Sequence, residues 1–219
     1  MTASMTRFAI LLGGDLVVTP RLSRQLAGAR VIAADSGMRH AAALGLTPEL
    51  WTGDFDSVEE GLRAFHADVP MEIFPPEKDQ TDGEIAVDAA LKRGARELVL
   101  VGAFGGERAD HAWLHLAAAL RLAETGMFCL LTSGAQEGVP LLPGPETRLD
   151  YEDGTPFSVL GFSDLEGLTL SGAKWPLDRR FVPFGSSLTL SNEVRGALTA
   201  RLDAGRAMLL ARPASYYAL

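Results

Sequence analysis

The feature that most constrains the fold of this chain is the alternation of short apolar runs with helix-like segments over its first 133 residues. The runs are continuous in apolar residues, which is typical of strands buried on both faces of a parallel sheet. They lie at 8–12, 31–34, 50–52, 71–74, 98–101 and 128–131. Between the runs, helices are expected over about 38–44, from Ser57 as cap to about residue 65, and after the capping-box pattern Thr81-Asp82-Gly83-Glu84. Strands that alternate with helices predict an α/β fold with a parallel, Rossmann-like sheet.

The sequence changes in character after about residue 134. Pro140, Pro143 and Pro145 indicate a linker or the first turns of a second unit. Short apolar runs without a helical period follow at 157–160, 168–170, 187–190, 197–202 and 207–211. We expect the last two runs to pair across a turn at 203–205. The chain is therefore predicted to contain an α/β domain over residues 1–135 and an antiparallel β-sandwich domain over residues 136–219.

The composition argues against several classes of protein. The formal net charge is −8, so the chain has no evident basic face for nucleic acid. Cys129 is the only cysteine, which leaves neither a disulfide framework nor a zinc-ligand spacing. No basic leader precedes a long apolar stretch, and no segment is apolar enough to span a bilayer. We expect a cytoplasmic protein without nucleic-acid or membrane partners.

Carboxylates gather where two neighbouring apolar runs end. Asp54 and Asp56 follow the third run, and Asp79 and Asp82 follow the fourth. Ligands of parallel sheets bind beyond the carboxyl ends of the strands, and close carboxylates repel one another unless a cation joins them. Mg²⁺ prefers such oxygen ligands and accompanies nucleotide phosphates. We favour one magnesium and nucleotide site with two or three of these acids as direct ligands; the alternative is an acidic turn that caps a helix.

Other polar residues near strand ends allow two interpretations each. Asp35-Ser36-Gly37 is either a plain strand-to-helix turn or a helix terminus that faces phosphate. Arg108 either contacts phosphate or forms a weak surface ion pair with Asp110. His111 is a candidate base, although a helix-start histidine satisfied by its neighbours is the plainer interpretation. Lys78 either offsets the acidic repulsion, contacts phosphate or is solvated.

The second unit contains three residues that suit a heterocyclic ligand. Trp175 either packs half-buried beside a turn or offers its ring to an aromatic or cationic ligand. Ser191 and Asn192 either bond a heteroaromatic ring or form a turn. Spacing does not decide between these interpretations.

In their order along the chain these motifs resemble those of thiamin pyrophosphokinases. The matching segments are 34–37, 47–50, 53–57, 76–82, 105–111, 172–177 and 191–193. The resemblance implies a two-domain homodimer, with thiamin bound between the α/β domain of one subunit and the β-sandwich of the other. It also implies Mg²⁺ as cofactor and ATP as co-substrate.

The resemblance assigns roles to individual residues. Asp54, Asp56 and Asp82 would hold Mg²⁺, and Trp175, Ser191 and Asn192 would contact thiamin. The implied ATP-binding residues are Asp35, Ser36, Gly37, Lys78, Thr81, Arg108, Asp110 and His111. The implied catalytic residues are Asp35, Asp54, Asp56, Asp79, Asp82 and Arg108.

The implied reaction transfers a diphosphate group from ATP to the hydroxyl of thiamin and gives thiamin diphosphate and AMP. Asp35, or otherwise Asp79, would accept the hydroxyl proton. Three alternatives remain. A pyrophosphokinase acting on a pterin alcohol would use the same metal site. A nucleotide-sugar glycosyltransferase would use Asp54-Phe55-Asp56 as its metal motif, and a sensor would bind thiamin or nucleotide without catalysis.

Overall fold

The computed structural model describes residues 6–56 and 58–213. The chain divides into two compact units. The first comprises Met1–Ala112 and Met127–Gly134, and the second comprises Trp113–Gly126 and Ala135–Leu219. No helix in the described part of the chain has the length and apolar character needed to cross a membrane.

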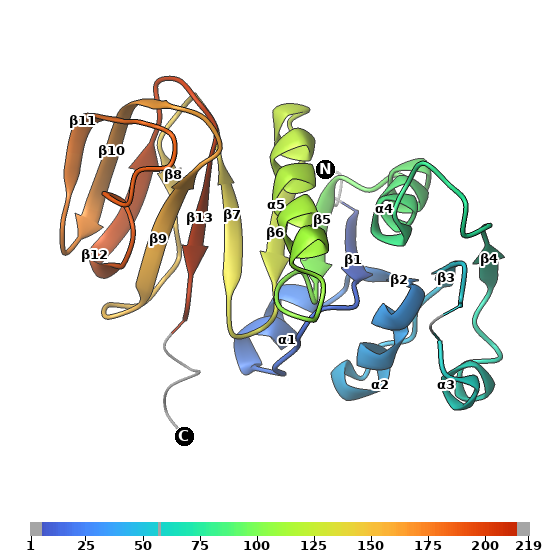
Figure 1. The fold of residues 1–219 in the computed structure, drawn as a ribbon. Coiled ribbons are helices and arrows are strands. Elements are labelled where there is room, and N and C mark those ends of the chain that lie inside the picture. Colours follow the sequence, from blue (N-terminus) through green and yellow to red (C-terminus); the bar gives the residue numbers. More distant parts are fainter. Residues whose placement is uncertain (1–5, 57, 214–219) are drawn as a thin grey trace, which may run out of the picture. The chain divides into compact units, whose positions relative to one another are not determined.

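The first unit is built on a parallel sheet with the strand order β6-β5-β1-β2-β3-β4 (Figure 1). The strands are β1 (Arg7–Leu11), β2 (Arg30–Ala34), β3 (Leu50–Gly53), β4 (Met71–Ile73), β5 (Glu97–Val101) and β6 (Phe128–Thr132). Apart from Phe128 at the start of β6, their apolar side chains are buried in every strand except β4, which is the edge strand on its side. The six expected strands are thus all present, and their parallel pairing brings their carboxyl ends to one edge.

The helices begin and end largely at residues that the sequence marks. They are α1 (Pro20–Leu26), η1 (Asp35–His40), α2 (Ala41–Leu44), α3 (Glu60–Phe65), α4 (Asp82–Lys92) and α5 (Ala109–Glu124). The predicted capping box of α4 is confirmed, because the Thr81 hydroxyl accepts from Glu84 N–H while the Glu84 carboxylate accepts from Thr81 N–H. This cap fixes the first turn of α4, where Asp82 lies.

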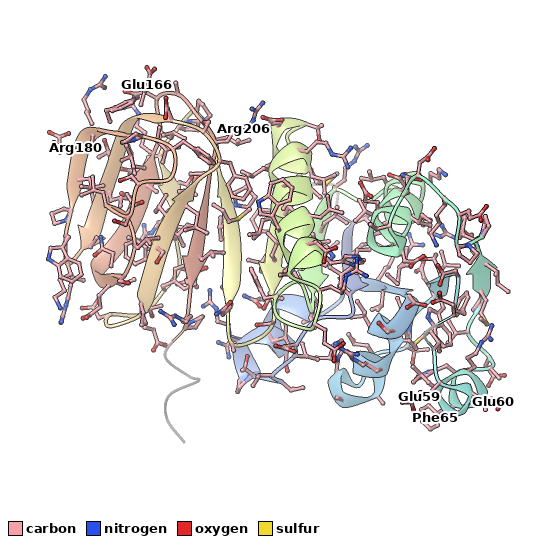
Figure 2. All side chains as sticks on the ribbon, in the orientation of Figure 1. Glu59, Glu60, Phe65, Glu166, Arg180 and Arg206 are labelled. Carbon is pink, nitrogen blue, oxygen red and sulfur yellow. The ribbon has the colours of Figure 1, made fainter. Side chains whose placement is uncertain are left out.

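Three helical details differ from the sequence-based expectation. The helix expected over 38–44 is a 3₁₀ turn, η1, followed by the short α2. Helix α1 was not predicted; Thr19 caps it and Pro20 occupies its first turn. The proposed cap of α3, Ser57, lies outside the described residues, and α3 is a surface helix with exposed Phe65 (Figure 2).

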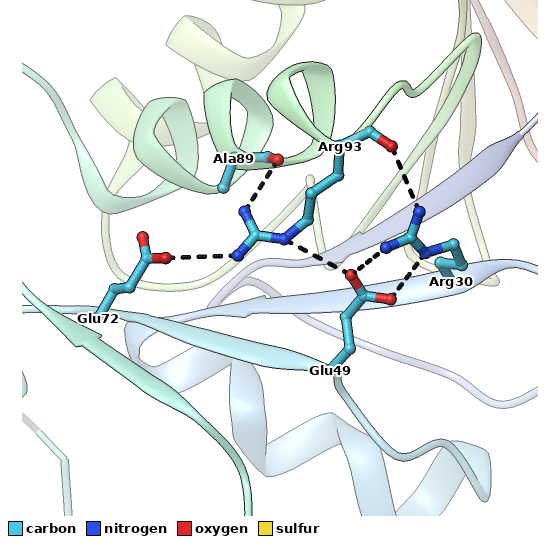
Figure 3. Close-up of polar contacts among 5 residues, drawn as sticks. All are labelled: Arg30, Glu49, Glu72, Ala89 and Arg93. Carbon is cyan, nitrogen blue, oxygen red and sulfur yellow. Dashed lines mark hydrogen bonds and ion pairs between the residues drawn. The ribbon is translucent and has the colours of Figure 1, made fainter.

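A network of charged side chains fastens the carboxyl end of α4 to the sheet (Figure 3). Arg30 of β2 donates to both carboxylate oxygens of Glu49, at 2.8 and 2.6 Å, and to the carbonyl of Arg93 at 3.3 Å. Arg93 in turn pairs with Glu49 and with Glu72 of β4. Because these groups are partly exposed, the network contributes about 1 kcal/mol or less per pair. Its structural effect is to tie α4 to β2 and β4.

The second unit consists of antiparallel strands in two sets that enclose one core. One set contains β7 (Glu137–Leu141), β9 (Pro156–Gly161) and β13 (Ala207–Ala211), and the other contains β8 (Thr147–Arg148), β10 (Leu165–Ala173), β11 (Leu177–Val182) and β12 (Asn192–Arg201). Asn192 and Glu193, at the start of β12, also pair with β9. Buried side chains of both sets, such as Val159 and Leu198, pack into a common hydrophobic cluster.

Two expectations for the second unit were wrong. The proline-rich segment, interpreted as a linker or as the start of a second unit, belongs to the second unit, because it contains β7, whose Leu141 joins the hydrophobic core. The segment 187–190 is a turn and not a strand; Leu190 N–H donates to Ser187 at 3.1 Å. The runs 197–202 and 207–211 do not form a hairpin, because Asp203 and Ala204 pair with Glu166 and the chain passes from one set of strands to the other.

Candidate active site

Three carboxylates from successive strand ends meet at the carboxyl edge of the parallel sheet. Asp35 directly follows β2, Asp54 directly follows β3, and Asp82 begins α4 after β4. One carboxylate oxygen from each lies within 4.8 Å of the other two. Asp56 lies outside this group and is exposed, as is Asp79. Acids from separate loops therefore lie close together at this edge, and two of the three predicted magnesium ligands, Asp54 and Asp82, are among them.

The turn after β3 directs Asp54 and Asp56 differently. Asp56 N–H donates to Asp54 Oδ1 at 3.3 Å, which closes a local turn around Phe55. Phe55 has a φ of 62°, a left-handed conformation that is uncommon for a bulky residue. Its side chain is 4 % exposed, so it anchors the turn in the core. Asp54 thus stays half-buried while Asp56 faces solvent.

Asp35 also has a left-handed backbone, with a φ of 43°. Gly53 lies against it, since a Cβ atom on Gly53 would be 3.2 Å from Asp35 Cα, Cβ and Oδ1. A larger residue at position 53 would therefore push on the Asp35 side chain. Strained residues of this kind are found preferentially at functional sites.

The ammonium group of Lys78 bridges two of the three acids. Lys78 Nζ lies 3.0 Å from Asp54 Oδ2 and 2.8 Å from Asp82 Oδ1. Burial raises the pKa of Asp82, and the charges of Asp54 and Asp35 add to this effect against the opposing influence of Lys78. Burial alone would also raise the pKa of Asp54, but the hydrogen bonds from Lys78 and from Asp56 N–H outweigh it and lower that pKa. For Lys78 the ion pairs outweigh burial, and its pKa is raised.

Thr81 uses its polar groups within the capping box. Its hydroxyl accepts from Glu84 N–H at 3.3 Å and donates to the Glu84 carboxylate at 3.1 Å. The residue therefore holds the amino end of α4 in place. This bonding fixes Asp82, its neighbour in the chain.

Two glycine-rich turns, after β1 and β5, lie side by side at the same edge of the sheet. Gly14 N–H donates to the Gly102 carbonyl at 3.0 Å, and Asp15 N–H donates to the Phe104 carbonyl at 2.8 Å. A Cβ atom on Gly14 would be 2.4 Å from both carbonyl oxygens, so only glycine permits this approach. The turn at Gly13 to Asp15 was missing from the sequence-based site, although its Gly-Gly-Asp signal follows the first apolar run.

The residues of η1 tie this first turn to the loop after β2. Arg39 donates to the carbonyls of Gly13 and Gly14, and His40 Nε2 lies 2.9 Å from the Gly14 carbonyl. Gly37 lies directly on β1, because a Cβ atom there would be 2.1 Å from the Leu11 carbonyl. Ser36 also packs against this turn, because its Oγ lies 2.6 Å from where a Cβ atom on Gly13 would be.

Arg108, in the exposed loop that leads into α5, pairs with Asp110 in the first turn of that helix. Arg108 Nε and Nη2 donate to the two carboxylate oxygens of Asp110 at 3.0 and 2.7 Å. The Arg108 guanidinium holds the pKa of Asp110 far below its usual range. His111 follows on α5 and is half-buried. An anionic ligand that binds Arg108 in this conformation must compete with Asp110.

In the second unit, Asn192 holds the backbone of Trp175. Asn192 Nδ2 donates to the Trp175 carbonyl at 2.8 Å, and its Oδ1 accepts from Trp175 N–H at 3.1 Å. Asn192 is 6 % exposed, whereas Trp175 is 55 % exposed with Lys174 Nζ 4.7 Å from its ring centroid. Ser191 is exposed and has a φ of 59°. The structure thus presents the Trp175 ring and uses the Asn192 amide to position it.

A parallel sheet with acids and glycine-rich turns at its carboxyl edge defines an α/β protein of the nucleotide-binding type. Residues 25–131 match the family described as thiamin pyrophosphokinase, catalytic domain, and residues 146–207 match thiamin pyrophosphokinase, vitamin B1 binding domain. The chain is 31 % identical over 167 residues to the thiamine pyrophosphokinase of Bacillus subtilis (strain 168), which covers 74 % of this chain and 77 % of that protein. The chain belongs to the thiamin pyrophosphokinase family, as the motifs predicted.

Solved structures of the family have the same fold. The crystal structure of thiamine pyrophosphokinase from Bacillus subtilis has a TM-score of 0.83 at 26 % identity and covers 95 % of this chain and 99 % of its own. That of thiamin pyrophosphokinase from Geobacillus thermodenitrificans has a TM-score of 0.75 at 27 % identity, with coverage of 96 % and 99 %. The two sequence matches and these structures identify the chain as an enzyme of this class.

Proposed function

We propose that the protein transfers a diphosphate group from ATP to the hydroxyl of thiamin in a Mg²⁺-dependent reaction that gives thiamin diphosphate and AMP. The observation that carries the proposal is the approach of Asp35, Asp54 and Asp82 to within 4.8 Å of one another. These residues offer hard oxygen ligands, and Mg²⁺ takes few protein carboxylates and keeps several waters. The residues present therefore fit the ion, with Asp35, Asp54 and Asp82 as its holders. When bound, Mg²⁺ neutralises part of the charge on the phosphate groups.

The chain's own residues then bind and orient the substrates. Gly14 and Gly105 allow the turns after β1 and β5 to pack closely against each other at this edge of the sheet, where the triphosphate is proposed to bind. Lys78 supplies a positive charge beside Asp54 and Asp82, where phosphate oxygens would lie. When the nucleotide binds, a phosphate group would replace the Asp110 carboxylate as the partner of Arg108, since the planar guanidinium can bond either anion.

Asp35 is the acceptor that we favour for the thiamin hydroxyl proton. It belongs to the converging group and is half-buried, whereas Asp79 lies on the exposed side of the loop before α4. A base must lie within hydrogen-bonding reach of the proton that it takes. Asp35 would meet this requirement for a hydroxyl bound beside the three acids if one of its carboxylate oxygens held the ion and the other accepted the proton.

We assign residues 1–135 to ATP binding and catalysis and residues 136–219 to thiamin binding, in keeping with the two family matches. The half-exposed ring of Trp175 suits stacking with a cationic thiazolium or a pyrimidine. Exposed apolar residues of the second unit support a homodimer with thiamin at the subunit interface. They are Trp175, Phe181, Phe184, Leu188 and Leu190. A reaction that consumes ATP favours the cytoplasm as its location.

The proposal is tested by incubating the protein with ATP, Mg²⁺ and either thiamin or a pterin alcohol, and then measuring AMP. We expect AMP to form when thiamin is the acceptor and not when the pterin alcohol is the acceptor. AMP with the pterin alcohol, a nucleoside diphosphate in place of AMP, or ligand binding without turnover would each support one of the alternatives. Asp54→Asn should lower AMP formation by at least about a hundredfold while the circular dichroism spectrum is retained. Near-wild-type turnover of this variant at saturating Mg²⁺ would defeat the metal assignment.

A further inference from the structure

We propose that Trp51 is a positioning residue that holds Asp35 and Asp54 in register through two different parts of its indole ring. The inference rests on the proposed metal site. Trp51 lies on β3, is 0 % exposed, and is among the largest fully buried side chains of the chain. Neither the acid motifs nor the family-like segments include it.

The first contact of Trp51 is a hydrogen bond to the loop after β2. Trp51 Nε1 donates to the Asp35 carbonyl at 2.8 Å. A buried indole N–H needs such a partner, so the bond is costly to lose. Gly53, two residues further along β3, lies against Asp35 from the same strand. Strand β3 therefore supports Asp35 at two points, through the indole of Trp51 and through the backbone of Gly53, which has no side chain.

The second contact of Trp51 is an aromatic pair with the loop after β3. Its ring and that of Phe55 meet edge to face, with centroids 5.0 Å apart and planes at 76°. Arg63 lies over the Phe55 ring, with its Cζ 5.1 Å from the centroid. Phe55 forms the centre of the turn that directs Asp54, so fixing its ring fixes the turn.

The backbone conformations indicate why such support is needed. In the described part of the first unit, Asp35 and Phe55 are the two residues other than glycine with a positive φ. Each such conformation is unfavourable and persists only when its surroundings enforce it. Trp51 contacts both residues. One side chain thus enforces the two strained turns from which two of the three converging carboxylates project.

The test measures Mn²⁺ binding to the protein alone, by calorimetry or electron paramagnetic resonance, without nucleotide. Trp51→Phe removes the N–H but keeps an aromatic ring for Phe55, and should weaken Mn²⁺ binding about tenfold, as loss of a supporting bond to a metal ligand does. Phe55→Leu tests the second contact and should also weaken binding. If both substitutions act on the same metal site, the Mn²⁺ affinity of the double variant should fall by less than the product of the two single fold-changes.

Leu98→Ala in β5 is the matched control, because Leu98 is fully buried and pairs with Phe8 and Cys129, far from the acid loops in the strand register. It should lower the melting temperature and leave Mn²⁺ affinity unchanged. Unchanged affinity in folded Trp51→Phe and Phe55→Leu, or an equal loss in Leu98→Ala, would overturn the positioning role. Absence of Mn²⁺ binding by the wild-type protein would instead overturn the metal site, and this inference with it.

Discussion

Lys78 Nζ lies 2.8 Å from Asp82 Oδ1 and, on its other side, 3.0 Å from Asp54 Oδ2. The three side chains are at most 24 % exposed, so solvent screens their charges only in part. The ammonium group supplies positive charge that close carboxylates require. A divalent cation held by the same oxygens would compete with it.

The first prediction concerns this competition. Lys78→Met should tighten Mn²⁺ binding to the nucleotide-free protein by about tenfold, because the competing charge is removed from within a few ångströms of the ion. In the presence of a metal chelator, the same variant should lose about 1–3 kcal/mol in free energy of unfolding, because the half-buried Asp54 and Asp82 lose their shared partner. Calorimetry and urea denaturation measure the two effects. Lys92→Met, at the exposed end of α4, should change neither; equal or weaker Mn²⁺ binding by Lys78→Met would contradict the competition.

The second prediction asks whether Asp35 or Asp56 acts as a metal ligand beside Asp54 and Asp82. Asp35→Asn should weaken Mn²⁺ binding at least about tenfold. Asp56→Asn should change it by less than about threefold, because Asp56 is exposed and contributes its backbone N–H, which the substitution keeps. Titration of both variants under one set of conditions gives the comparison. The reverse order of effects would restore Asp56 as a ligand.

This contrast shows what the sequence could and could not predict about the site. The carboxyl edge was predictable because buried apolar runs give way to Gly and Asp at Gly13, Asp35 and Gly53. The different positions of Asp35 and Asp56 were not predictable, because both follow a strand and the exposure of Asp56 depends on the left-handed turn at Phe55. The role of Trp51 was hidden for a related reason: an apolar strand residue gives no sign of what its indole N–H will bond.

The second unit shows the same limit on a larger scale. The predicted run 197–202 overlaps the second half of β12 and the run 207–211 coincides with β13, and the turn residues between them suited a hairpin. The pairing was wrong because Ala204 forms its bridge with Glu166. Local turn chemistry predicts where the chain bends, but the long-range partner of each strand depends on burial of the whole core.

The third prediction concerns pH and His40. Burial lowers the pKa of His40, Arg39 adds to this effect, and the bond to Gly14 and the charge of Asp15 oppose it. In the unfolded chain the histidine titrates near its ordinary value of about 6.5. The unfolded state therefore binds the proton more readily, and stability present above this pH is lost as the pH falls through it toward the lower folded pKa. The slope can approach about 1.4 kcal/mol per pH unit.

His40→Gln tests this prediction, because the amide can still donate to the Gly14 carbonyl but does not titrate. Urea denaturation between pH 7.5 and 5.5 should show a shallower loss of unfolding free energy in the variant than in the wild-type protein. The two curves should differ most at the acidic end. Parallel curves over the whole range would show that His40 does not contribute to the acid sensitivity.

The fourth prediction concerns Asn192 and the presentation of Trp175. Asn192→Ala removes both bonds that hold the Trp175 backbone, and leaves the partly buried N–H groups of Trp175 and Glu193 without their shared acceptor. The free energy of unfolding should fall by about 1–3 kcal/mol. The KM for thiamin should rise about tenfold, while the KM for ATP stays unchanged, because the sites for the two substrates are proposed to lie on different units. Steady-state kinetics with each substrate varied in turn measures this split.

Thr199→Val provides the control for Asn192→Ala, since it lies on the same strand and loses one exposed hydrogen bond to Glu146. Its KM for thiamin should match that of the wild-type protein.

Ser191→Ala then asks whether the neighbouring hydroxyl contacts thiamin directly, because the structure uses its backbone N–H to bond Ser158 and leaves the side chain exposed. An unchanged KM for thiamin in Asn192→Ala would refute the positioning role of Asn192. Either the Trp175 ring would then be held in place without the amide, or thiamin would bind elsewhere.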